Sequence, residues 1–519
     1  MGDIRQKLPA SRAIAVAATA APRQRPAASP LVGALPLLVL LAVTVALRCA
    51  VAAHMDFETD EAYYWLWSRQ LAMSYFDHPP MVAYLIKLGT WLFGDTLFGV
   101  RCMAIAAMTA ASALLYALAA VLFGERRSGL LSVLWFNVTP HTAFFSIIMY
   151  PDTPAILFWV LACLALALIW RSGRGEWWYL VGIAIGLLML SKYTGMFLLF
   201  GILAWLLTSH EMRRWLKRRE PYLALLIASL LFSPVLIWNA EHGWISLTKQ
   251  FGRALESSAA GGVANMAAFV GIQAVFVSPL IFAFIIAGLA VAAWRGWRAQ
   301  QANWLLLALT AAPTLLYFLA HALSAEVLAQ WPSAAYPTGI IAAVAAFAPG
   351  AKNREHLAVT RYGFAAAPWL GLLFTLAMLA QMTIRLLPVT AARDPLSRFA
   401  GWAELASQAQ AVAAANHAGY IATDDYGTNA TLAFYLHDIP VFQTSEAIRY
   451  AFLPPLDQAM LAGTPGIYLA TPPFDDVAQL RKHFASVEFA ATIWRTRDGD
   501  PIESYRVYTL NGYRGGLPF

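Results

Sequence analysis

Residues 54–95 read HMDFETDEAYYWLWSRQLAMSYFDHPPMVAYLIKLGTWLFGD, an acidic and aromatic stretch between two strongly apolar runs. Asp60 and Glu61 open an aromatic helical segment, 62–71, and a rigid Asp77-His78-Pro79-Pro80 turn precedes an amphipathic segment, 81–93. Neither segment is long or apolar enough to cross a bilayer, because a span needs about 20 apolar residues. We expect both segments to lie at a membrane surface with aromatic side chains among the headgroups, which would hold the carboxylates at the height of a lipid phosphate.

The apolar runs on either side belong to a chain whose main solvent is lipid. Of its 519 residues, 60% are hydrophobic and only 13% are charged, which is too little charge to cover a soluble protein of this length. The pattern predicts a mainly α, polytopic membrane fold with about 11–13 transmembrane helices. The apolar runs cover residues 31–53, 97–123, 129–149, 153–170, 177–191, 194–208, 221–238, 267–293, 302–320, 332–349 and 362–387.

Basic residues gather in alternate loops between these runs. They are Arg126 and Arg127, Arg171 and Arg174, the cations of 213–219, Arg295 and Arg298, and Lys352, Arg354 and Arg361. By the positive-inside rule these loops face the cytoplasm, which puts the acidic loop 54–96 on the outer side. We therefore expect a multi-pass protein of the bacterial inner membrane with its active site facing the periplasm. The net charge of +7 reflects this topology and not a nucleic-acid partner.

The composition divides the chain into three parts. Residues 1–30, rich in Ala, Pro and Arg, are expected to form a disordered cytoplasmic tail, and residues 31–387 a transmembrane domain. Residues 388–519 have shorter apolar runs and predict a small periplasmic α/β domain. Within it, 420–423, 466–470, 487–493 and 505–510 are typical of strands, and 403–415 and 475–484 are typical of helices.

The acids of the loop 54–96 suit glycosyl transfer. An acceptor hydroxyl loses its proton as it attacks the anomeric carbon of a sugar, and a carboxylate within hydrogen-bond reach accepts that proton. We predict that Asp60 is this base, since the pair Asp60-Glu61 at a membrane surface costs desolvation unless it has a function. The alternative is that Asp60 caps the helical segment. Glu61 and Asp152 would order the base or the acceptor, although a helix cap also explains Asp152.

Cations on the acidic side are candidates for contact with the phosphate of a lipid carrier. Lys192, in the sequence SKYTG, His78 and Lys249 are predicted to contact this phosphate, and His242 to contact phosphate or a headgroup. The alternatives are a snorkelling Lys192 and an ordinary exposed loop around His242. Arg48 and Arg101, each near the outer end of a span, are interpreted as snorkelling anchors.

The aromatic residues and the candidate cofactor motifs indicate a function less clearly than the acids and cations do. The aromatic residues predicted to bind substrate are Tyr63, Tyr64, Tyr193, Trp331 and Tyr336, although an interfacial aromatic belt also explains the last two. Asp77, His78 and His242 have the ligand types of a zinc site but lack the spacing of an HExxH helix, so the sequence establishes no cofactor and leaves a divalent metal open. The chain has no P-loop or GxGxxG pattern that would support a nucleotide donor.

These residues together resemble a known family. The sequences Asp60-Glu61-Ala62-Tyr63-Tyr64-Trp65 and Tyr75-Phe76-Asp77-His78-Pro79-Pro80 are similar to those of bacterial members of glycosyltransferase family 39. The motifs Ser191–Gly195, Asn239–Trp244 and Trp331-Pro332 follow in the family's order, so the resemblance covers nearly all of the membrane region. This is the protein O-mannosyltransferase-like and aminoarabinose-transferase-like branch of the GT-C superfamily.

The resemblance implies a GT-C fold with interfacial helices in the first periplasmic loop, and inverting transfer from polyprenyl-phosphate sugars. It assigns Asp60 to the family's catalytic aspartate, Asp152 to a second acidic position and Lys192 to a basic position near the donor phosphate. The aminoarabinose transferases differ at two positions, because they carry Arg where this chain has Tyr63 and Lys where it has His78. Both differences change the charge near the donor, so neither an aminoarabinose donor nor a lipid A acceptor follows from the motifs.

The predicted function is that of a membrane enzyme that moves a sugar from a polyprenyl-phosphate carrier to a cell-envelope glycolipid, lipid A or polysaccharide, with membrane lipids around it. A protein O-glycosyltransferase of the same family is one alternative. A transporter or flippase of lipid-linked sugars is another, but transporters place ionisable residues near the bilayer midplane in two similar halves. Here the acids gather at one surface and no half-to-half repeat is visible, which favours the enzyme.

Overall fold

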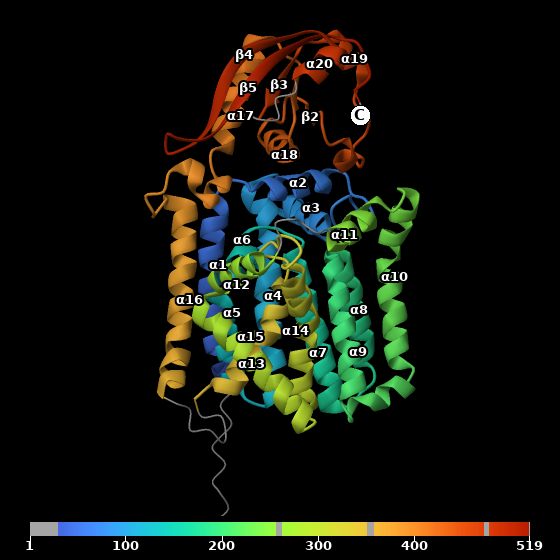
Figure 1. Ribbon diagram of the computed structural model, residues 1–519, viewed down its shortest axis with the longest axis vertical. Helices are drawn as coiled ribbons and strands as arrows, with labels where there is room; N and C mark the ends of the chain where they lie inside the picture. The colour runs from blue at the N-terminus through green and yellow to red at the C-terminus, as the bar shows by residue number, and fades with distance from the viewer. Residues whose placement is uncertain (1–29, 256–261, 350–357, 472–476, 518–519) are drawn as a thin grey trace, which may run out of the picture.

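A computed structural model describes residues 30–255, 262–349, 358–471 and 477–517. A bundle of helices carries the first loop and a small sheet at one of its ends (Figure 1). The mainly α, polytopic membrane fold with a small C-terminal α/β domain that was predicted from the sequence is confirmed. The predicted tail, residues 1–30, lies outside the described residues except for its last position, as do Lys352 and Arg354.

Seven helices of the described residues are long and apolar enough to cross a membrane, so this is a multi-pass membrane protein. They are α1 (Pro30–His54), α4 (Leu97–Phe123), α7 (Asp152–Ser172), α10 (Glu220–Glu241), α13 (Pro279–Arg298), α14 (Ala302–His321) and α16 (Ala358–Ile384). The shorter apolar helices α8 (Trp177–Ser191), α9 (Met196–Thr208) and α15 (Tyr336–Phe347) lie where three more spans were predicted.

Two predicted spans are wrong as single helices. Residues 129–149 form α5 (Arg126–Asn137) and α6 (Pro140–Ile147), bent by 72° from each other. Residues 267–293 divide into α12 (Val263–Val277) and α13 at Ser278, whose φ is 83°. In both places a proline begins the second helix, because a proline has no N–H for the preceding helix and disfavours helical geometry in the residue before it.

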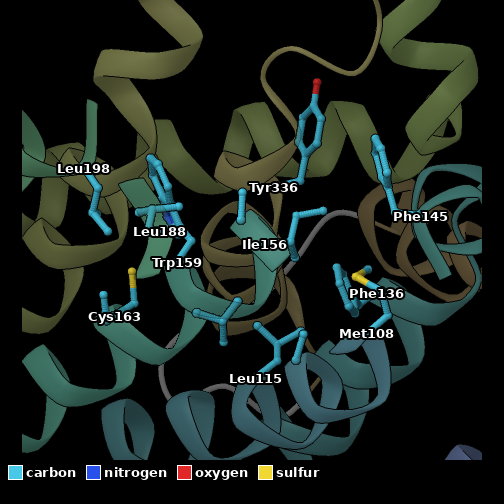
Figure 2. Packing of buried hydrophobic residues seen from close by; sticks show 14 of the residues in the cluster. Met108, Leu115, Phe136, Phe145, Ile156, Trp159, Cys163, Leu188, Leu198 and Tyr336 are labelled. Atoms are coloured by element: carbon cyan, nitrogen blue, oxygen red, sulfur yellow. The ribbon is translucent and has the colours of Figure 1, made fainter. Parts of the chain in front are cut away.

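The core of the bundle lies around α7, which packs against α4 and α8. Ile156, Trp159 and Cys163 of α7 are almost completely buried, and Figure 2 shows them among side chains of the neighbouring helices. Close helix contacts need small residues, as where a Cβ on Gly182 would lie 2.5 Å from the carbonyl oxygen of Ala224. This close packing holds the end of α7 that carries Asp152 in a fixed place.

The first loop forms two helices, α2 (Thr59–Arg69) and α3 (Met81–Phe93), between the bundle and the C-terminal sheet (Figure 1). The aromatic side chains of α2 do not face headgroups, as the sequence led us to expect, since Trp65 and Trp67 are at most 4% exposed. They are covered by the C-terminal residues, with the rings of Trp65 and Phe434 5.0 Å apart. Exposed aromatic side chains lie instead at the end of α3, at Trp91 and Phe93.

The C-terminal residues form a five-stranded sheet with the order β2-β1-β3-β5-β4. Its strands are β1 (Tyr420–Thr423), β2 (Val441–Gln443), β3 (Gly466–Ala470), β4 (Phe484–Arg497) and β5 (Asp500–Tyr513). Strand β1 pairs in parallel with β2 and β3, while β5 pairs antiparallel with β3 and β4. The helices are α17 (Trp402–Ala415), α18 (Tyr426–Tyr435), α19 (Gln458–Gly463) and α20 (Val477–His483).

Helix α18 faces the bundle and packs on α2 (Figure 1). The sequence reasoning missed both α18 and β2, because a helix of 10 residues and a strand of 3 residues give only weak periodic patterns. Helix α11 (Ile245–Leu255) lies at the same end of the bundle as α2 and α3 (Figure 1). The two helices that border the first loop, α11 and α18, therefore come from parts of the chain that are far apart in the sequence.

Candidate active site

A cavity of about 600 Å³ opens between the first loop, the ends of α7 to α10 and the C-terminal residues. Its polar lining residues are Asp60, Tyr63, Tyr64, Asp77, His78, Tyr150, Asp152, Lys192, Tyr193, Thr194, Gln250, Tyr317, His321, Gln330, Tyr426 and Arg449. Its apolar lining residues are Met189, Met196, Phe197, Phe232, Leu236, Leu247, Phe251, Phe318 and Leu328. The cavity therefore combines a group of carboxylates and cations with a surface suited to a hydrocarbon chain.

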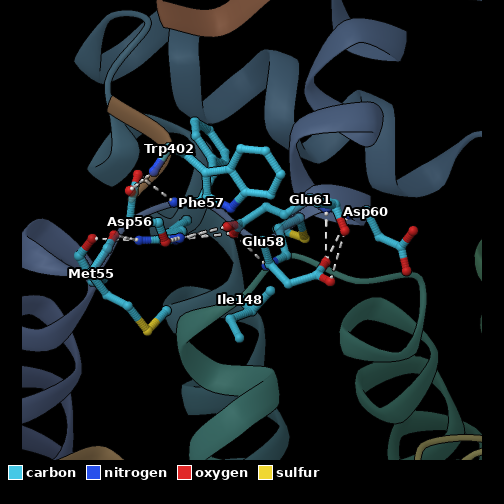
Figure 3. A network of polar contacts seen from close by, with 12 residues as sticks. Met55, Asp56, Phe57, Glu58, Asp60, Glu61, Ile148 and Trp402 are labelled. Carbon is cyan, nitrogen blue, oxygen red and sulfur yellow. Dashed lines mark hydrogen bonds and ion pairs between the residues drawn. The ribbon is translucent and has the colours of Figure 1, made fainter. Parts of the chain in front are cut away.

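Asp60 lies in the first turn of α2 and presents its carboxylate to the cavity. The capping alternative is wrong for this residue, because the cap is Glu58, which accepts hydrogen bonds from the backbone nitrogens of Asp60 and Glu61. Figure 3 shows the Asp60 carboxylate directed away from that network. Its Oδ1 accepts from the Tyr426 hydroxyl at 2.7 Å and its Oδ2 from the Tyr150 hydroxyl at 3.2 Å. The carboxylate is thus held by two phenols and faces open space.

Glu58 is completely buried behind Asp60. Besides the two backbone nitrogens, it accepts a hydrogen bond from the Tyr150 hydroxyl at 2.6 Å and pairs with Arg398. Burial raises the pKa of Glu58 to about 7, and the neighbouring charge of Asp60 adds to this, against the opposing effect of Arg398. Tyr150 therefore connects two carboxyl groups of which one lines the cavity and the other does not.

Glu61, which was predicted to order the base or the acceptor, does not line the cavity. Its carboxylate is fully buried and pairs with Arg101 at 2.7 Å, and it also accepts a hydrogen bond from the Met149 backbone nitrogen. The snorkelling interpretation of the two span-end arginines is wrong as well. Arg101 is fully buried, and Arg48, 4% exposed, donates to the side-chain oxygen of Asn137 at 2.6 Å. These groups join elements of the fold instead of reaching solvent.

Asp152 and Lys192 form a buried ion pair in the cavity wall, with Nζ 2.6 Å from Oδ1. Asp152 begins α7, but the residue at the cap position is Pro151, which makes no side-chain capping bond, so capping does not explain Asp152. Lys192 lies between α8 and the short turn Tyr193–Gly195 and is 7% exposed, so it does not snorkel. The sequence prediction that these two residues belong to one site agrees with their contact.

Asp77 receives two cations from different parts of the chain. Lys249 of α11 contacts its Oδ1, and Arg449 of the C-terminal residues donates to its Oδ2 at 2.7 Å. The hydroxyl of Tyr63 also donates to Oδ2, at 3.2 Å. Burial alone would raise the pKa of Asp77, but the two cations outweigh burial and lower the pKa below its ordinary value. This carboxylate is therefore ionised. It lines the cavity beside Arg449, whereas Lys249, which was predicted to contact phosphate, is not among the lining residues.

The predicted metal ligands are not brought together. His242 stacks on Trp238 with the ring centroids 4.1 Å apart, and its Nδ1 is 2.8 Å from the Trp238 carbonyl oxygen. It does not line the cavity, whereas Asp77 and His78 do. Within the described residues no group of three or more His, Cys, Asp or Glu side chains could hold a metal ion. His242 is therefore misplaced both as a ligand and as a substrate contact, and the metal itself stays a prediction.

The predicted aromatic residues fall into two groups. Tyr63, Tyr64, Tyr193 and Trp331 line the cavity. Tyr336 does not, because it is 1% exposed inside the bundle and its hydroxyl donates to Gln273. The aromatic wall of the cavity is therefore formed by the first loop, the turn after α8 and the segment before α15.

Three residues that contact the carboxylates of Asp60 and Asp77 were missed by the sequence reasoning. Tyr150 adjoins the predicted Asp152 and could have been found from that position. Tyr426 and Arg449 belong to the C-terminal residues, more than 360 positions away from Asp60 and Asp77 in the chain, and no sequence pattern connects them to the first loop. Arg449 also lies over the ring of Tyr426, 4.2 Å from its centroid.

The arrangement suits a proton transfer beside a phosphate ester. A carboxylate held at both oxygens can accept a proton from a hydroxyl that enters the cavity. Lysine and arginine provide charge for a phosphate or another anion. The apolar wall could hold the hydrocarbon of a lipid-linked molecule.

Comparison with known proteins agrees with this chemistry. Residues 77–238 match the family described as dolichyl-phosphate-mannose-protein mannosyltransferase. The matched region includes Asp77, Asp152 and Lys192 but neither Asp60 nor the C-terminal residues. The lipid A galacturonosyltransferase RgtD of Rhizobium johnstonii is 28% identical over 384 residues, 74% of this chain and 78% of its own length.

A shorter match and a solved structure extend the comparison. The undecaprenyl phosphate-α-4-amino-4-deoxy-L-arabinose arabinosyl transferase of Pseudomonas aeruginosa is 33% identical over 150 residues, and the match spans 28% of this chain and a quarter of that protein (25%). The crystal structure of ArnT from Cupriavidus metallidurans superposes with a TM-score of 0.60 at 16% identity, over 92% of this chain and 98% of that one. A second crystal structure of that ArnT is bound to undecaprenyl phosphate.

Proposed function

We propose that this chain is a membrane glycosyltransferase of the GT-C type and that it transfers a sugar from undecaprenyl phosphate, or a similar polyprenyl phosphate, to lipid A. Two relatives support these substrates. The lipid A galacturonosyltransferase supports lipid A as the acceptor, and the arabinosyl transferase, whose name includes undecaprenyl phosphate, supports that carrier for the donor. The apolar wall of the cavity, next to cations, supports a donor with a prenyl chain and a phosphate.

The observation that carries this proposal is the position of Asp60, whose carboxylate stands in a lipid-sized cavity between two phenols. In the proposed reaction the acceptor hydroxyl gives its proton to Asp60 while its oxygen bonds to the anomeric carbon of the donor sugar. The bond from that carbon to the phosphate oxygen breaks, and the electron pair leaves with the polyprenyl phosphate. Lys192, oriented by Asp152, offsets the charge on the leaving phosphate.

We place the site at the periplasmic face of the bacterial inner membrane. The first loop and the cavity lie at one end of the bundle, whereas the basic clusters around Arg126, Arg171 and Arg214 lie in the turns at the opposite end. The positive-inside rule assigns that opposite end to the cytoplasm. Accessibility labelling of a single cysteine at exposed Asp95, in the first loop, should therefore succeed from the periplasmic side alone.

A reconstitution assay tests the transfer. Purified protein in liposomes is given radiolabelled undecaprenyl-phosphate donors that carry a hexuronic acid, an aminopentose or a neutral hexose, together with lipid A or an unfolded protein as acceptor. We expect label on lipid A, and Asp60→Asn should lower kcat by about 10²- to 10⁴-fold, since it removes a general base. Repeating the assay with EDTA checks the predicted divalent metal.

The matched control is Asp95→Asn, in the same loop. Asp95 pairs with Arg69 at a partly exposed position outside the cavity, so this variant should keep the wild-type rate. Unchanged transfer by a folded Asp60→Asn variant would remove Asp60 as the base. If label appears on the protein acceptor alone, the chain is a protein O-glycosyltransferase and the lipid A proposal is wrong. If the vesicles take up the labelled donor without transfer of the sugar, the transporter is favoured.

A further inference from the structure

The C-terminal residues meet four acids of the first loop with hydrogen-bond donors, whereas the fully buried Glu61 pairs with Arg101 of the bundle. Asp56 accepts from the Trp402 backbone nitrogen and the Tyr435 hydroxyl, Glu58 pairs with Arg398, Asp60 accepts from the Tyr426 hydroxyl, and Asp77 pairs with Arg449. Two of these donors, Tyr426 and Tyr435, are the first and last residues of the same helix, α18. Of these donors, Tyr426 and Arg449 line the cavity, and neither was predicted to belong to it.

The two tyrosines make the same kind of contact in different surroundings. Tyr426 donates to Oδ1 of Asp60 at 2.7 Å, and both residues line the cavity. Tyr435 donates to Oδ1 of Asp56, and neither of these residues lines it. Each contact fastens α18 to the first loop, but only the first one touches the carboxylate that we propose as the base.

We propose that Tyr426 is a positioning residue that orients the Asp60 carboxylate for proton transfer from the acceptor. This inference rests on the proposed function, because it assumes that Asp60 is the base. Each carboxylate oxygen can accept two hydrogen bonds. Tyr426 donates to Oδ1 at 2.7 Å, whereas the Tyr150 hydroxyl has one hydrogen, lies closer to Glu58 (2.6 Å) than to Oδ2 of Asp60 (3.2 Å), and is the weaker donor to Asp60. Tyr426 therefore does most to orient the carboxylate, and both oxygens keep an acceptor position for the incoming hydroxyl.

The ring of Tyr426 is itself held in place from several sides. The Arg449 guanidinium lies 4.2 Å from its centroid, and the ring of Tyr63 packs edge-on at 5.2 Å. The Tyr450 hydroxyl donates to the Tyr426 carbonyl oxygen at 2.8 Å. Burial and the charge of Asp60 raise the pKa of Tyr426, so the phenol stays protonated and remains a donor. A fixed donor of this kind limits the movement of Asp60 before an acceptor binds.

The experiment compares Tyr426→Phe with Tyr435→Phe in the transfer assay. Tyr426→Phe removes the hydrogen bond that orients the charged Asp60 carboxylate, so kcat should fall by about 10- to 100-fold. The KM of the donor should change by less than about twofold, because Tyr426 is not proposed to bind the donor. Because the lost donor favoured the ionised carboxylate, the acidic limb of the kcat profile should also move to higher pH. Tyr435→Phe should leave kcat and the pH profile as they are in the wild type.

A double variant and a spectroscopic measurement complete the test. Since Tyr426 acts through Asp60, adding Tyr426→Phe to Asp60→Asn should change the residual rate by less than about twofold. Independently of activity, the infrared difference between wild type and Asp60→Asn isolates the Asp60 carboxylate bands, which Tyr426→Phe should shift and Tyr435→Phe should not.

Equal losses in Tyr426→Phe and Tyr435→Phe would show that α18 only fastens the two parts together, and an unshifted infrared band would show that Tyr426 does not hold Asp60. Either result overturns the inference. Absence of transfer by the wild type with every donor would instead contradict the proposed function, while the infrared comparison would still decide whether Tyr426 orients Asp60. Melting temperatures of all variants separate misfolding from these outcomes.

Discussion

Glu58 and Asp60 are separated by one residue, yet their environments differ. Asp60 faces the cavity, whereas Glu58 is fully buried and caps α2. From the sequence, Asp60 could be either a base or a helix cap, and the structure gives the capping position to Glu58. The longer side chain of Glu58 reaches the free backbone nitrogens from one residue before the helix, which leaves the Asp60 carboxylate available.

The raised pKa of Glu58 predicts a pH dependence of stability. The pKa is about 7 in the folded protein against 4.5 ordinarily, so the folded state holds a proton that the unfolded state has lost between these values. The resulting stabilisation is complete below pH 4.5 and is lost as the pH rises through 7. The melting temperature in detergent should therefore fall across this window, and Glu58→Gln, which keeps a capping oxygen, should flatten the slope. A slope that is equally steep in Glu58→Gln would assign the effect to other groups.

Among the helices, buried ion pairs connect elements that are not consecutive in the chain or that a turn separates. Glu61 of α2 pairs with Arg101 of α4, and Asp152 of α7 pairs with Lys192 after α8. Arg101 also donates to the carbonyl oxygens of Ala52 and Met55, at the end of α1. The start of the first loop is thus held against two helices of the bundle, α1 and α4, which fixes the position of the segment that carries Asp60.

The Glu61–Arg101 pair predicts a large effect on stability. Glu61→Gln leaves the Arg101 charge buried without its carboxylate, which should destabilise the protein by about 3–5 kcal/mol. The measurement is thermal or denaturant unfolding in detergent. Asp95→Asn, which breaks the exposed pair with Arg69, should cost only about 0–1 kcal/mol. Similar losses in the two variants would mean that burial does not distinguish these pairs.

At the scale of the whole molecule, the C-terminal residues act as one wall of the cavity. Tyr426 and Arg449 line it, and α18 covers the aromatic face of α2. The approach is close at Gly427, where an added Cβ would lie 2.7 Å from Cβ of Thr59. No side chain fits there without moving α18 away from the first loop.

Gly427→Val should therefore separate the C-terminal residues from the first loop. Because this removes the contact of Tyr426 with Asp60, we expect transfer to fall by at least about tenfold while the helical bundle stays folded. Limited proteolysis should show faster cleavage near residues 385–400, and circular dichroism should show unchanged helix content. Gly463→Val is the matched control, since a Cβ on Gly463 would meet nothing within 4 Å. A fully active Gly427→Val protein would contradict a role of this wall in the reaction.

The amino-acid sequence was enough to predict the membrane character, the mainly α fold and most of the helices and strands. These features depend on the length of apolar runs and on the spacing of apolar residues, which are properties of neighbouring residues. The sequence also singled out Asp60, Asp77, Asp152 and Lys192, which all line the cavity, since charged groups are rare in such a chain. Only the tertiary structure decided which acids face the cavity. Glu61 pairs with Arg101 and His242 stacks on Trp238, both away from the cavity. Tyr426 and Arg449, from the C-terminal part of the chain, line it. These outcomes depend on contacts between distant segments, whose pairing no local pattern of residues encodes.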